Sequence, residues 1–488
     1  MNHSVVQYLS KDDSSCGYCK SSNGNVSHGM WAHSLTVGDY QNLIDRGWRR
    51  CGLYCYKPVM NEICCPAYTI RCDALNLKLT KSQKKVLRHF NAFLRRPQNI
   101  NVDTTSDPRG VSSDDVGFKL PKPVMHNPQP LSACEKEITT AYVKRDTETN
   151  EELRKRKVTS NDEPKTEMNV GKMSLQTDAK PGVGEDKSKP KCKKAKMLRL
   201  ERRKAKLQMK GITETPPKEP PSATEKTLED YINECEGLSK ARNLELVLVP
   251  ACSDESILQE SWLLYKKYQT VIHNDEEDEC TFSGFSNFLV SSPLQAYKDD
   301  DSPPCGYGSF HQLYKLDGKL IAVGVIDILP KCVSSVYFFY DPEYSQLSLG
   351  TYGTLRELEL TRKYAKQLPL LNQYYLGFYI HSCAKMRYKG NIRPSYLLCP
   401  EVYSWHPFDT CLSKIEASKY SRLNDDPNVK SGEDNVNIDE ILVLTQQGIM
   451  PYPLFKTLKS LSTEEQELVK EYALLVGVSY KKMFLRIR

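Results

Sequence analysis

Two closely spaced pairs of cysteines constrain this chain more than any other feature of its sequence. Cys16 and Cys19 frame a Cys-Gly-Tyr-Cys turn, and the adjacent pair Cys64 and Cys65 follows after 44 intervening residues. A Cys-x-x-Cys turn places two thiolates on one side of a tight loop, which is the half-site that a zinc ion or an iron–sulfur cluster needs. Because neither pair supplies enough ligands alone, we expect the fold to bring all four thiolates together. Adjacent cysteines are unusual in structural zinc sites, which favours a cluster or a redox role.

Two other interpretations of these cysteines are open: buried small apolar residues, or the disulfides of a secreted domain. Cys51, Cys55 and Cys72 crowd the same region, so only some of the cysteines can be ligands. Residues 1–15 contain neither a basic start followed by an apolar core nor a small-residue cleavage site. With 17 cysteines and no export signal, we expect a reducing setting, in the cytoplasm and the nucleus.

The composition indicates that part of the chain does not belong to a packed core. Only 39% of its 488 residues are hydrophobic, and residues 97–224 are rich in Ser, Thr, Asp, Glu, Lys and Pro with few aromatics. Such a stretch cannot bury enough apolar surface to offset the entropy of ordering it. We therefore expect residues 97–224 to be a mostly disordered basic and polar linker or insertion.

A run of positive charge lies inside this linker. Residues 187–210 contain twelve Lys or Arg and one acidic residue, Glu201, although the whole chain has a formal net charge of only +7. Such a run attracts phosphate backbones and resembles a nuclear localisation signal. A solvated charged helix fits the same composition. No apolar run approaches the roughly 20 residues that span a bilayer, so we expect no membrane partner.

Alternation and turn signals predict a mixed arrangement of strands and helices after residue 240. Asp317-Gly318 is the preferred two-residue turn of a hairpin and lies between two apolar, strand-like runs. The elements expected in order are a strand at 244–249, a helix carrying Trp262 and Tyr265, strands at 311–316, 320–327 and 335–340, a helix at 349–364 and a strand at 374–380. Hairpin, strand, Gly-bearing turn, helix and strand is the order found in the acyltransferase fold of the Gcn5-related N-acetyltransferases.

Two sets of motifs, one in each half of the chain, carry a resemblance to a known family. The first set is CGYC at 16–19, GMWAHS at 29–34, DRGWRR at 45–50, YKP at 56–58, CCP at 64–66 and YTIR at 68–71. The second set is YDP at 340–342, LSLG at 347–350, YIHSC at 379–383, KMRYKG at 385–390 and LLCP at 397–400. Over about residues 1–90 and 240–410, the chain resembles the eukaryotic arginyl-tRNA–protein transferases.

This resemblance implies an enzyme that transfers arginine from arginyl-tRNA to the amino terminus of a protein. The acceptor would begin with Asp, Glu or oxidised Cys, and the ubiquitin system would read the added arginine as a degradation signal. Cys16, Cys19, Cys64 and Cys65 correspond to the family cysteines that hold an iron–sulfur cluster, with zinc as the alternative, and no nucleotide cofactor is expected. We also expect a monomer or a weak homo-oligomer.

The fold class expected from these observations is α+β. We predict a Cys-rich domain that holds the metal or cluster over residues 1–96, the disordered linker over 97–224, an N-acetyltransferase-like catalytic domain over 225–415 and a helical C-terminal extension over 416–488.

Asp341 is the first candidate for accepting a proton from the attacking amine. The arginyl ester of tRNA is already activated, so the enzyme mainly has to align the amine with the ester carbonyl. An α-amino group has a pKa near 8, and it must be neutral to attack. Asp341 ends a predicted strand beside the Gly-bearing turn, and Tyr340 and Asp327 are weaker candidates. The alternative roles are a turn or N-cap residue for Asp341, ahead of Pro342, and a core residue for Tyr340.

Lys385, Arg387 and Lys389 are the candidates for binding the acidic acceptor or the phosphates of tRNA. They follow a predicted core strand, and alternation would point all three to one side if that strand continued. A solvated basic loop is the alternative. Ser348 and Gly350, in the turn that opens the following helix, are expected to contribute to binding of substrate or tRNA.

Two other classes of function share parts of this pattern. An acyl-CoA-dependent N-acetyltransferase would use the Gly350 and Gly353 turn for pyrophosphate, but the turn lacks the dense, Arg-led glycine pattern of that family. A non-enzymatic zinc module that binds nucleic acid would need only the cysteines and the basic run. An assay of arginine transfer, with and without RNase, separates these classes.

Overall fold

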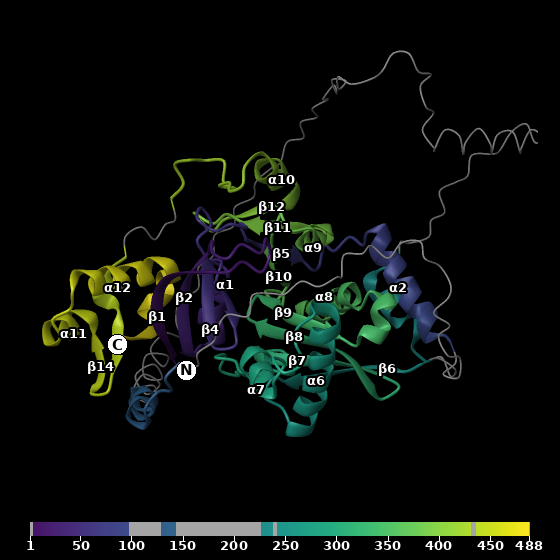
Figure 1. The fold of residues 1–488 in the computed structure, drawn as a ribbon, viewed down its shortest axis with the longest axis horizontal. Coiled ribbons are helices and arrows are strands. Elements are labelled where there is room, and N and C mark those ends of the chain that lie inside the picture. The colour runs from purple at the N-terminus through teal and green to yellow at the C-terminus, as the bar shows by residue number, and fades with distance from the viewer. Residues whose placement is uncertain (1–2, 97–127, 143–225, 238–241, 431–435, 488) are drawn as a thin grey trace, which may run out of the picture. The chain divides into compact units, whose positions relative to one another are not determined.

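The computed structural model describes residues 3–96, 128–142, 226–237, 242–430 and 436–487 (Figure 1). The chain divides into two compact units, one made of Met1–Glu152 with Thr227–Arg488 and the other of Leu153–Lys226. Of the second unit, Lys226 alone is among the described residues. The basic run at 187–210 therefore lies outside the described residues, as does most of the linker predicted over 97–224.

The first unit contains two β-sheets, and the first of them joins strands from both ends of the chain. Its strands, in spatial order, are β14 (Gly448–Pro451), β13 (Leu442–Thr445), β15 (Met483–Arg486), β1 (Ser4–Ser14), β2 (Asn25–Ser34), β4 (Tyr54–Pro58) and β3 (Arg49–Cys51). β15 runs parallel to both of its neighbours, β1 and β13, and the other pairs are antiparallel. The amino-terminal and carboxy-terminal segments therefore share one sheet.

The second sheet has eight strands and takes one inner strand, β5, from the amino-terminal segment. The order is β12 (Trp405–Pro407), β11 (Ser395–Leu398), β5 (Tyr68–Asp73), β10 (Gln373–Tyr379), β9 (Cys332–Tyr340), β8 (Lys319–Leu329), β7 (Gly308–Leu316) and β6 (Leu244–Pro250). β9 and β10 are parallel and the remaining pairs are antiparallel. The predicted hairpin is confirmed, because β7 and β8 pair around Asp317 and Gly318, which both have positive φ, 51° and 84°.

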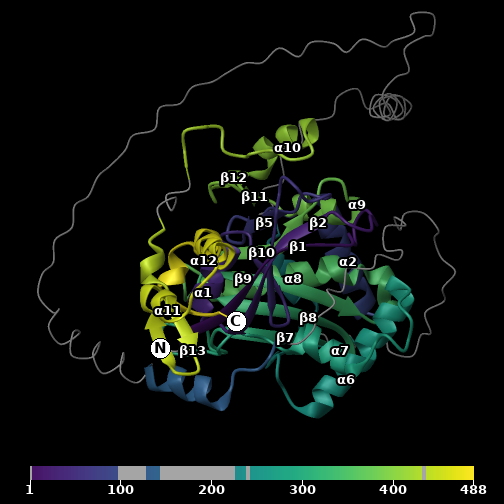
Figure 2. The ribbon, with the colours of Figure 1, turned by 60° about the vertical axis from the view of Figure 1, so that its left-hand side comes forward.

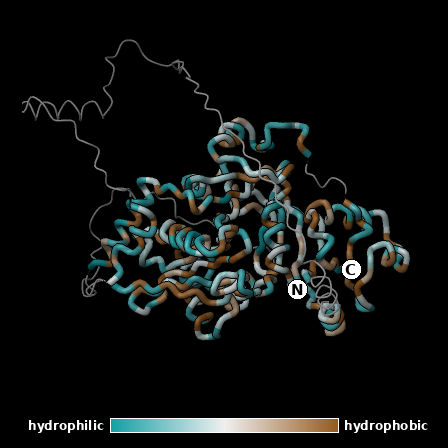
Figure 3. The backbone as a smooth tube through the Cα atoms, turned by 180° about the vertical axis from the view of Figure 1, so that it is seen from behind, coloured by the Kyte–Doolittle hydropathy of each residue, from teal (hydrophilic) through white to brown (hydrophobic). Residues whose placement is uncertain are grey.

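Helices cover both faces of the second sheet (Figure 2). Val323 and Val325 of β8 pack beneath α6 (Glu255–Tyr268) and α7 (Phe282–Phe285), whereas Ala322 and Ile326 belong to the core cluster that includes α8 (Leu349–Ala365). A strand covered on both faces needs a continuous apolar run, which β8 has. Elsewhere, hydrophobic and hydrophilic residues alternate along much of the described chain, as expected of elements that bury one face (Figure 3).

The remaining helices are short or lie at the ends of the sheets. α2 follows a capping box between Thr80 and Gln83. These helices are α1 (Val37–Ile44), α2 (Lys81–Leu94), α5 (Leu228–Ile232), α9 (Ala384–Arg387), α10 (Phe408–Ala417), α11 (Tyr452–Leu458) and α12 (Thr463–Val476). The shorter 3-10 and π turns are η2 (Asn233–Cys235), η3 (Gln269–His273), η4 (Ser286–Val290), η5 (Pro342–Leu347), η6 (Tyr388–Asn391), η7 (Ile438–Glu440) and η8 (Gly477–Lys481). Within the described ranges, no helix is both long enough and apolar enough to cross a bilayer.

The structure differs from the sequence expectations in two segments. Residues 133–142 form a helix inside the predicted linker, and its Ile138 and Tyr142 pack against Val5 and Phe484 of the first sheet. Residues 416–488, expected to be helical, also supply β13, β14 and β15. The mixed α and β class is confirmed, while the domain boundaries stay a prediction.

A buried ion pair joins the two sheets. Arg50 on β3 donates from Nε and Nη2 to the two carboxylate oxygens of Asp327 on β8, at 2.8 Å and 2.6 Å. Ser309 of β7 donates to the same carboxylate at 2.6 Å. The side chains of Arg50 and Asp327 are 1% and 0% exposed. A buried pair of this kind is balanced only while both partners are present, because either charge alone would remain desolvated.

We expect Arg50→Met to lower the free energy of unfolding by about 3–5 kcal/mol, because it leaves the Asp327 carboxylate buried and uncompensated. Denaturant titration of the full-length protein measures the change. The matched control is Lys11→Met, which breaks the exposed Lys11–Glu62 pair and should leave the transition unchanged. Equal transitions for the Arg50 variant and the control would show that the ion pair does not hold the sheets together.

Candidate functional site

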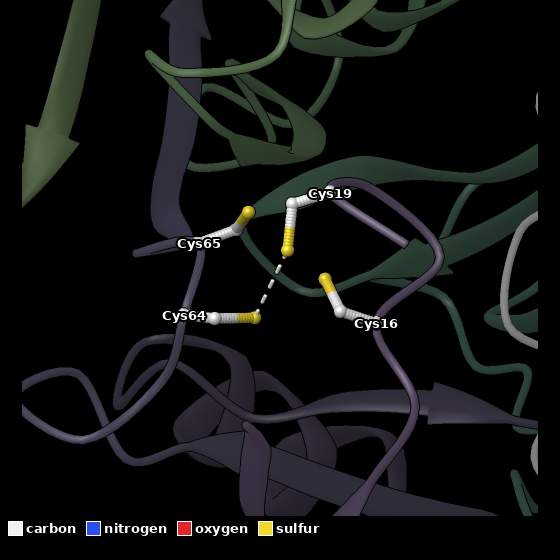
Figure 4. A group of neighbouring side chains, drawn as sticks. All are labelled: Cys16, Cys19, Cys64 and Cys65. Atoms are coloured by element: carbon white, nitrogen blue, oxygen red, sulfur yellow. Dashed lines mark hydrogen bonds between the residues drawn. The ribbon is translucent and has the colours of Figure 1, made fainter. Parts of the chain in front are cut away.

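The four predicted cysteine ligands come together in the structure (Figure 4). The Sγ atoms of Cys16, Cys19, Cys64 and Cys65 all lie within 4.8 Å of one another, and the Cys19 thiol approaches Cys64 Sγ at 3.6 Å. Cys16 and Cys65 are buried, whereas Cys19 is exposed and Cys64 is half-buried. Two loops that are far apart in sequence therefore bring their four thiol groups together.

The backbone around the first pair forms a turn that presents both thiols. The amide N–H of Cys16 donates to the Ser21 carbonyl at 2.9 Å, and Lys20 takes a left-handed conformation with φ of 64°. The amide N–H of Tyr18 donates to Cys16 Sγ at 3.4 Å. Cys64 is tied to the same region, because its amide N–H donates to the Gly24 carbonyl at 2.7 Å.

The ionisation of these thiols suits a bound cation. A hydrogen bond from the Ser21 backbone is the main cause that lowers the pKa of Cys19 to about 6. Burial raises the pKa of Cys64 to about 11 and that of Cys65 to about 12. A metal ion deprotonates coordinating thiols outright and would offset that penalty. The donor set therefore fits a single metal centre with four thiolate ligands.

The neighbouring cysteines behave differently. Cys51 and Cys55 are buried, and desolvation raises the pKa of each thiol to about 12. Cys72 is also buried, on β5, with its thiol pKa raised to about 12 by burial. These three residues lie outside the group of four and pack as small apolar side chains.

The cysteine group is packed against the end of β10. Cys16 and Cys65 belong to one buried cluster with Ala67, Phe378 and Ile380. Cys383 and Met386 pack at the margin of that cluster. The metal-binding loops of the amino-terminal half thus lie beside the basic motif of the second half.

Lys385, Arg387 and Lys389 do not continue strand β10, so the condition under which alternation would point all three to one side is not met. The strand ends at Tyr379, and the chain turns through α9 and η6 because Ala, Lys, Met and Arg are strong helix formers. Arg387 is exposed, whereas Lys385 and Lys389 are half-buried. The three side chains are therefore not arranged on one face of a strand.

Lys389 has the most unusual environment of the three cations. Its Nζ donates to the carbonyl of Phe378 at 3.0 Å, next to the Cys16 and Cys65 cluster. Burial, and then the nearby charge of Arg49, lower the pKa of Lys389 to about 7. An amine with this pKa exchanges a proton near neutral pH, which an ordinary surface lysine does not.

Asp341 is part of a structural ion cluster. Its side chain accepts from Lys267 at 2.7 Å, from Lys319 at 3.1 Å and from the Glu343 amide N–H at 3.1 Å, as the N-cap of η5. Burial alone would raise the pKa of Asp341, but these bonds, led by the one from Lys267, lower it overall. A carboxylate stabilised in its ionised form is a weak proton acceptor. The geometry therefore favours a structural role for Asp341, as the N-cap residue of η5.

The other predicted residues lie near Asp341, around the start of α8. Tyr340 is buried and packs against Tyr268, with ring centroids 5.0 Å apart. Ser348 and Gly350 are exposed at the helix start, and Ser348 has a left-handed backbone with φ of 55°. Gly353 is a packing residue, because a Cβ there would collide with the Phe338 ring. Nothing in this turn marks it as a pyrophosphate cradle.

Comparison with known proteins decides the family. The family described as "Arginine-tRNA-protein transferase, N terminus" matches residues 14–85, and "Arginine-tRNA-protein transferase, C terminus" matches residues 260–399. Arginyl-tRNA–protein transferase 1 of Drosophila melanogaster is 43% identical over 501 residues, which covers 100% of both chains. This chain belongs to the arginyl-tRNA–protein transferase family.

More distant relatives of this transferase family extend the comparison. Arginyl-tRNA–protein transferase 2 of Arabidopsis thaliana is 34% identical over 496 residues, covering 90% of this chain and 81% of that protein. Aspartate/glutamate leucyltransferase of Pseudomonas aeruginosa is 34% identical over 154 residues, covering 31% of this chain and 57% of that protein. Family membership confirms the transferase class and disfavours the acetyltransferase and the zinc module.

The structure also reveals a cavity that the sequence analysis missed. It is about 210 Å³ in volume and is lined by residues of four family motifs, among them Arg46, Lys57, Thr69 and Pro400. The motifs DRGWRR, YKP, YTIR and LLCP are visible in the sequence, but they meet at one cavity only because the first sheet, which holds β4, lies against the second, which holds β5 and β11. Tyr403, with a left-handed φ of 55°, completes the wall and belongs to no motif that we had noted.

We expect the wild-type protein, purified without oxygen, to contain one metal centre, and Cys16→Ser and Cys65→Ser to lose it, because each removes one of four thiolates. Elemental analysis with visible absorption measures zinc, iron and sulfide. The control is Cys252→Ser, which changes an exposed cysteine outside the group. Unchanged metal content in both ligand variants would contradict a shared centre.

Proposed function

We propose that this protein transfers arginine from arginyl-tRNA to the amino-terminal α-amino group of acceptor proteins that begin with Asp, Glu or oxidised Cys. The observation that carries the proposal is the full-length similarity to arginyl-tRNA–protein transferase 1 of Drosophila. The bacterial relative is named aspartate/glutamate leucyltransferase. That name supports acceptors that begin with an acidic residue. A role for the added arginine as a degradation signal is part of the same proposal.

We propose that the second sheet and its helices form an acyltransferase fold related to the Gcn5 N-acetyltransferases. The β7–β8 hairpin, β9, the turn at Ser348, α8 and β10 follow one another, and β10 lies parallel to β9. We propose that this arrangement aligns the acceptor amine with the arginyl ester. Alignment is the main contribution needed, because the ester is already activated and proximity supplies roughly 7–11 kcal/mol.

We propose Lys389, rather than Asp341, as the group that takes the proton from the attacking amine. Lys389 is half-buried, is held by the Phe378 carbonyl and has its pKa lowered to about 7. Its neutral form accepts a proton as the amine attacks the ester carbonyl, and the resulting ammonium group returns that proton to the ribose oxygen of tRNA as the ester C–O bond breaks. Asp341 then orders the turn before α8 through Lys267 and Lys319.

The remaining cations and the helix start are proposed to bind tRNA. Arg387 is exposed and Lys385 is half-buried on α9, where both can approach phosphates. Ser348 and Gly350 lie at the exposed amino terminus of α8, whose dipole favours negative charge. We also propose that the protein acts as a monomer or weak homo-oligomer in the cytoplasm and the nucleus.

Cys16, Cys19, Cys64 and Cys65 would hold the metal centre and thereby fix two loops beside Lys389. Four thiolates around one ion at the Zn–S distance of about 2.3 Å lie roughly 3.8 Å apart, close to the separations here. The iron–sulfur cluster implied by resemblance would require the sulfur atoms to move apart. We propose that the centre orders the acceptor side of the site.

We expect the purified protein to incorporate radiolabelled arginine into a short peptide that begins with Asp, in the presence of arginyl-tRNA. RNase treatment of the charged tRNA should abolish incorporation, because the ester is the activated donor. The same peptide with a blocked amino terminus is the control and should stay unlabelled. Acetyl transfer from acetyl-CoA without arginine transfer would contradict the proposal.

We expect Lys389→Gln to lower kcat about a hundredfold, because general-base assistance contributes that order of rate. In the wild type, kcat should rise as pH passes through about 7, where Lys389 becomes neutral. In the variant, the remaining rise should follow the peptide amine, near pH 8. Asp341→Asn is the comparison and should keep the wild-type pH profile. If kcat of Lys389→Gln kept the wild-type pH dependence while kcat of Asp341→Asn lost its rise near pH 7, Asp341 and not Lys389 would be the proton acceptor.

A further inference from the structure

The first sheet is joined to its carboxy-terminal strands along one short seam, the pairing of β1 with β15. Residues 4–6 of β1 pair there with residues 483–485 of β15. On its other side β15 pairs with β13, which in turn pairs with β14. In the strand order of this sheet, the three carboxy-terminal strands therefore connect to the amino-terminal strands through the seam.

The helix at residues 133–142 packs across this seam, beside strands from both ends of the chain (Figure 2). Its Ile138 and Tyr142 belong to one apolar cluster with Val5 of β1, Phe484 of β15 and Leu444 of β13. The ring of Tyr142 meets the ring of Phe484 edge to face, with centroids 5.3 Å apart. One short helix from the middle of the chain thus covers the place where the two chain ends meet.

Polar contacts fix the same segment to β15 and to the turn after β13. Arg486 donates from Nε and Nη2 to the two carboxylate oxygens of Glu135, at 2.9 Å and 3.3 Å, and from Nη1 to the Gln129 carbonyl at 2.9 Å. The Glu135 side chain is only 4% exposed, so removal of either partner would leave a desolvated charge. The Cys134 thiol donates to the Gln446 carbonyl, between β13 and β14, at 3.1 Å.

The helix at 133–142 depends on these contacts for its own stability. It is shorter than the roughly 12–15 residues below which an isolated helix is marginal in water. A capping box between Ser132 and Glu135 supports its first turn but does not replace tertiary packing. Helix formation and docking are therefore coupled, and the segment has two states, folded and docked or released.

The carboxy-terminal segment reaches the DRGWRR motif through the end of α12. The carbonyls of Leu475 and Leu474 accept from Nε and Nη2 of Arg46, at 3.2 Å and 2.9 Å. The Leu475 carbonyl also accepts from the indole N–H of the fully buried Trp48, at 3.1 Å. Because η8 and β15 follow α12 directly in the chain, β15 anchors the segment that holds this loop.

We propose that residues 128–142 form a strap that holds β15 in the first sheet, and that arginine transfer requires the strap to be docked. The effect on transfer rests on the proposed function, whereas docking is measured without any substrate. The strap and β15 both lie outside residues 14–85 and 260–399, which match the two family descriptions. Release of the strap would loosen β15 and the end of α12, and with them the acceptors of Arg46 and Trp48.

The test measures amide hydrogen exchange in the full-length metal-loaded protein and in two strap variants, Ile138→Asp and Glu135→Gln. The first puts a charge into the apolar cluster, and the second leaves the guanidinium of Arg486 without its carboxylate. In both variants, the amides of β15 should exchange about tenfold faster than in the wild type. With arginyl-tRNA, kcat/KM for a peptide that begins with Asp should fall about tenfold, because the motif loop is displaced.

Two control variants separate release of the strap from other effects. Lys136→Ala changes an exposed residue of the same helix and should leave exchange and kcat/KM unchanged. Leu264→Ala removes a buried side chain from α6, so it should lower the midpoint of unfolding without faster exchange in β15. Equally fast exchange of β15 in Leu264→Ala and in the strap variants would show general destabilisation and overturn the inference.

Two further results would contradict the proposal. Wild-type exchange of β15 in both strap variants would show that the segment does not hold the strand. Faster exchange of β15 with unchanged kcat/KM would show that transfer does not require the docked strap. If the wild type transferred no arginine to any peptide, the proposed function would fail, while the exchange rates would still decide whether the strap holds β15.

Discussion

The buried ion pair between Arg50 and Asp327 is the interaction on which the rest of this structure depends. It fastens β3 of one sheet to β8 of the other, and Ser309 completes the hydrogen bonding of the carboxylate. β3 pairs with β4, and the loop after β4 carries Cys64 and Cys65. A pair of this kind adds little net stability over an apolar contact, but it fixes one arrangement of the two sheets, since any other would leave charges buried alone.

Everything proposed for the site follows from the segment between β4 and β5. Its first residues, Val59, Met60 and Asn61, line the cavity, and its end carries the cysteine pair. Ala67 lines the cavity and also packs against the cysteine group. A metal centre would tie this segment to the Cys16 turn and to the end of β10. The four-cysteine group and the cavity are thus neighbours, because one short segment contributes to both.

Local features of this fold were predictable from sequence, whereas long-range ones were not. The Asp317-Gly318 hairpin, the helix after Thr80 and the four cysteine ligands each carry their signal within a few residues or in a motif. The helix at 133–142 has such a signal too, the Ser132 and Glu135 capping box, but the polar composition around it concealed the helix. The parallel pairing of β15 with β1 joins segments almost a whole chain apart, and no local pattern encodes it. Lys57 and Tyr403 likewise meet only through tertiary structure.

We propose that arginine transfer takes place beside Lys389, where the loop that carries Cys64 and Cys65 packs against the end of β10. The most direct measurement is an experimental structure of the full-length protein with an Asp-initiated peptide and a tRNA that carries a non-transferable arginyl group. We expect the amine of the peptide to lie within hydrogen-bond distance of Lys389 Nζ and next to the arginyl ester. An amine bound beside Asp341, with Lys389 remote from the peptide, would contradict this assignment.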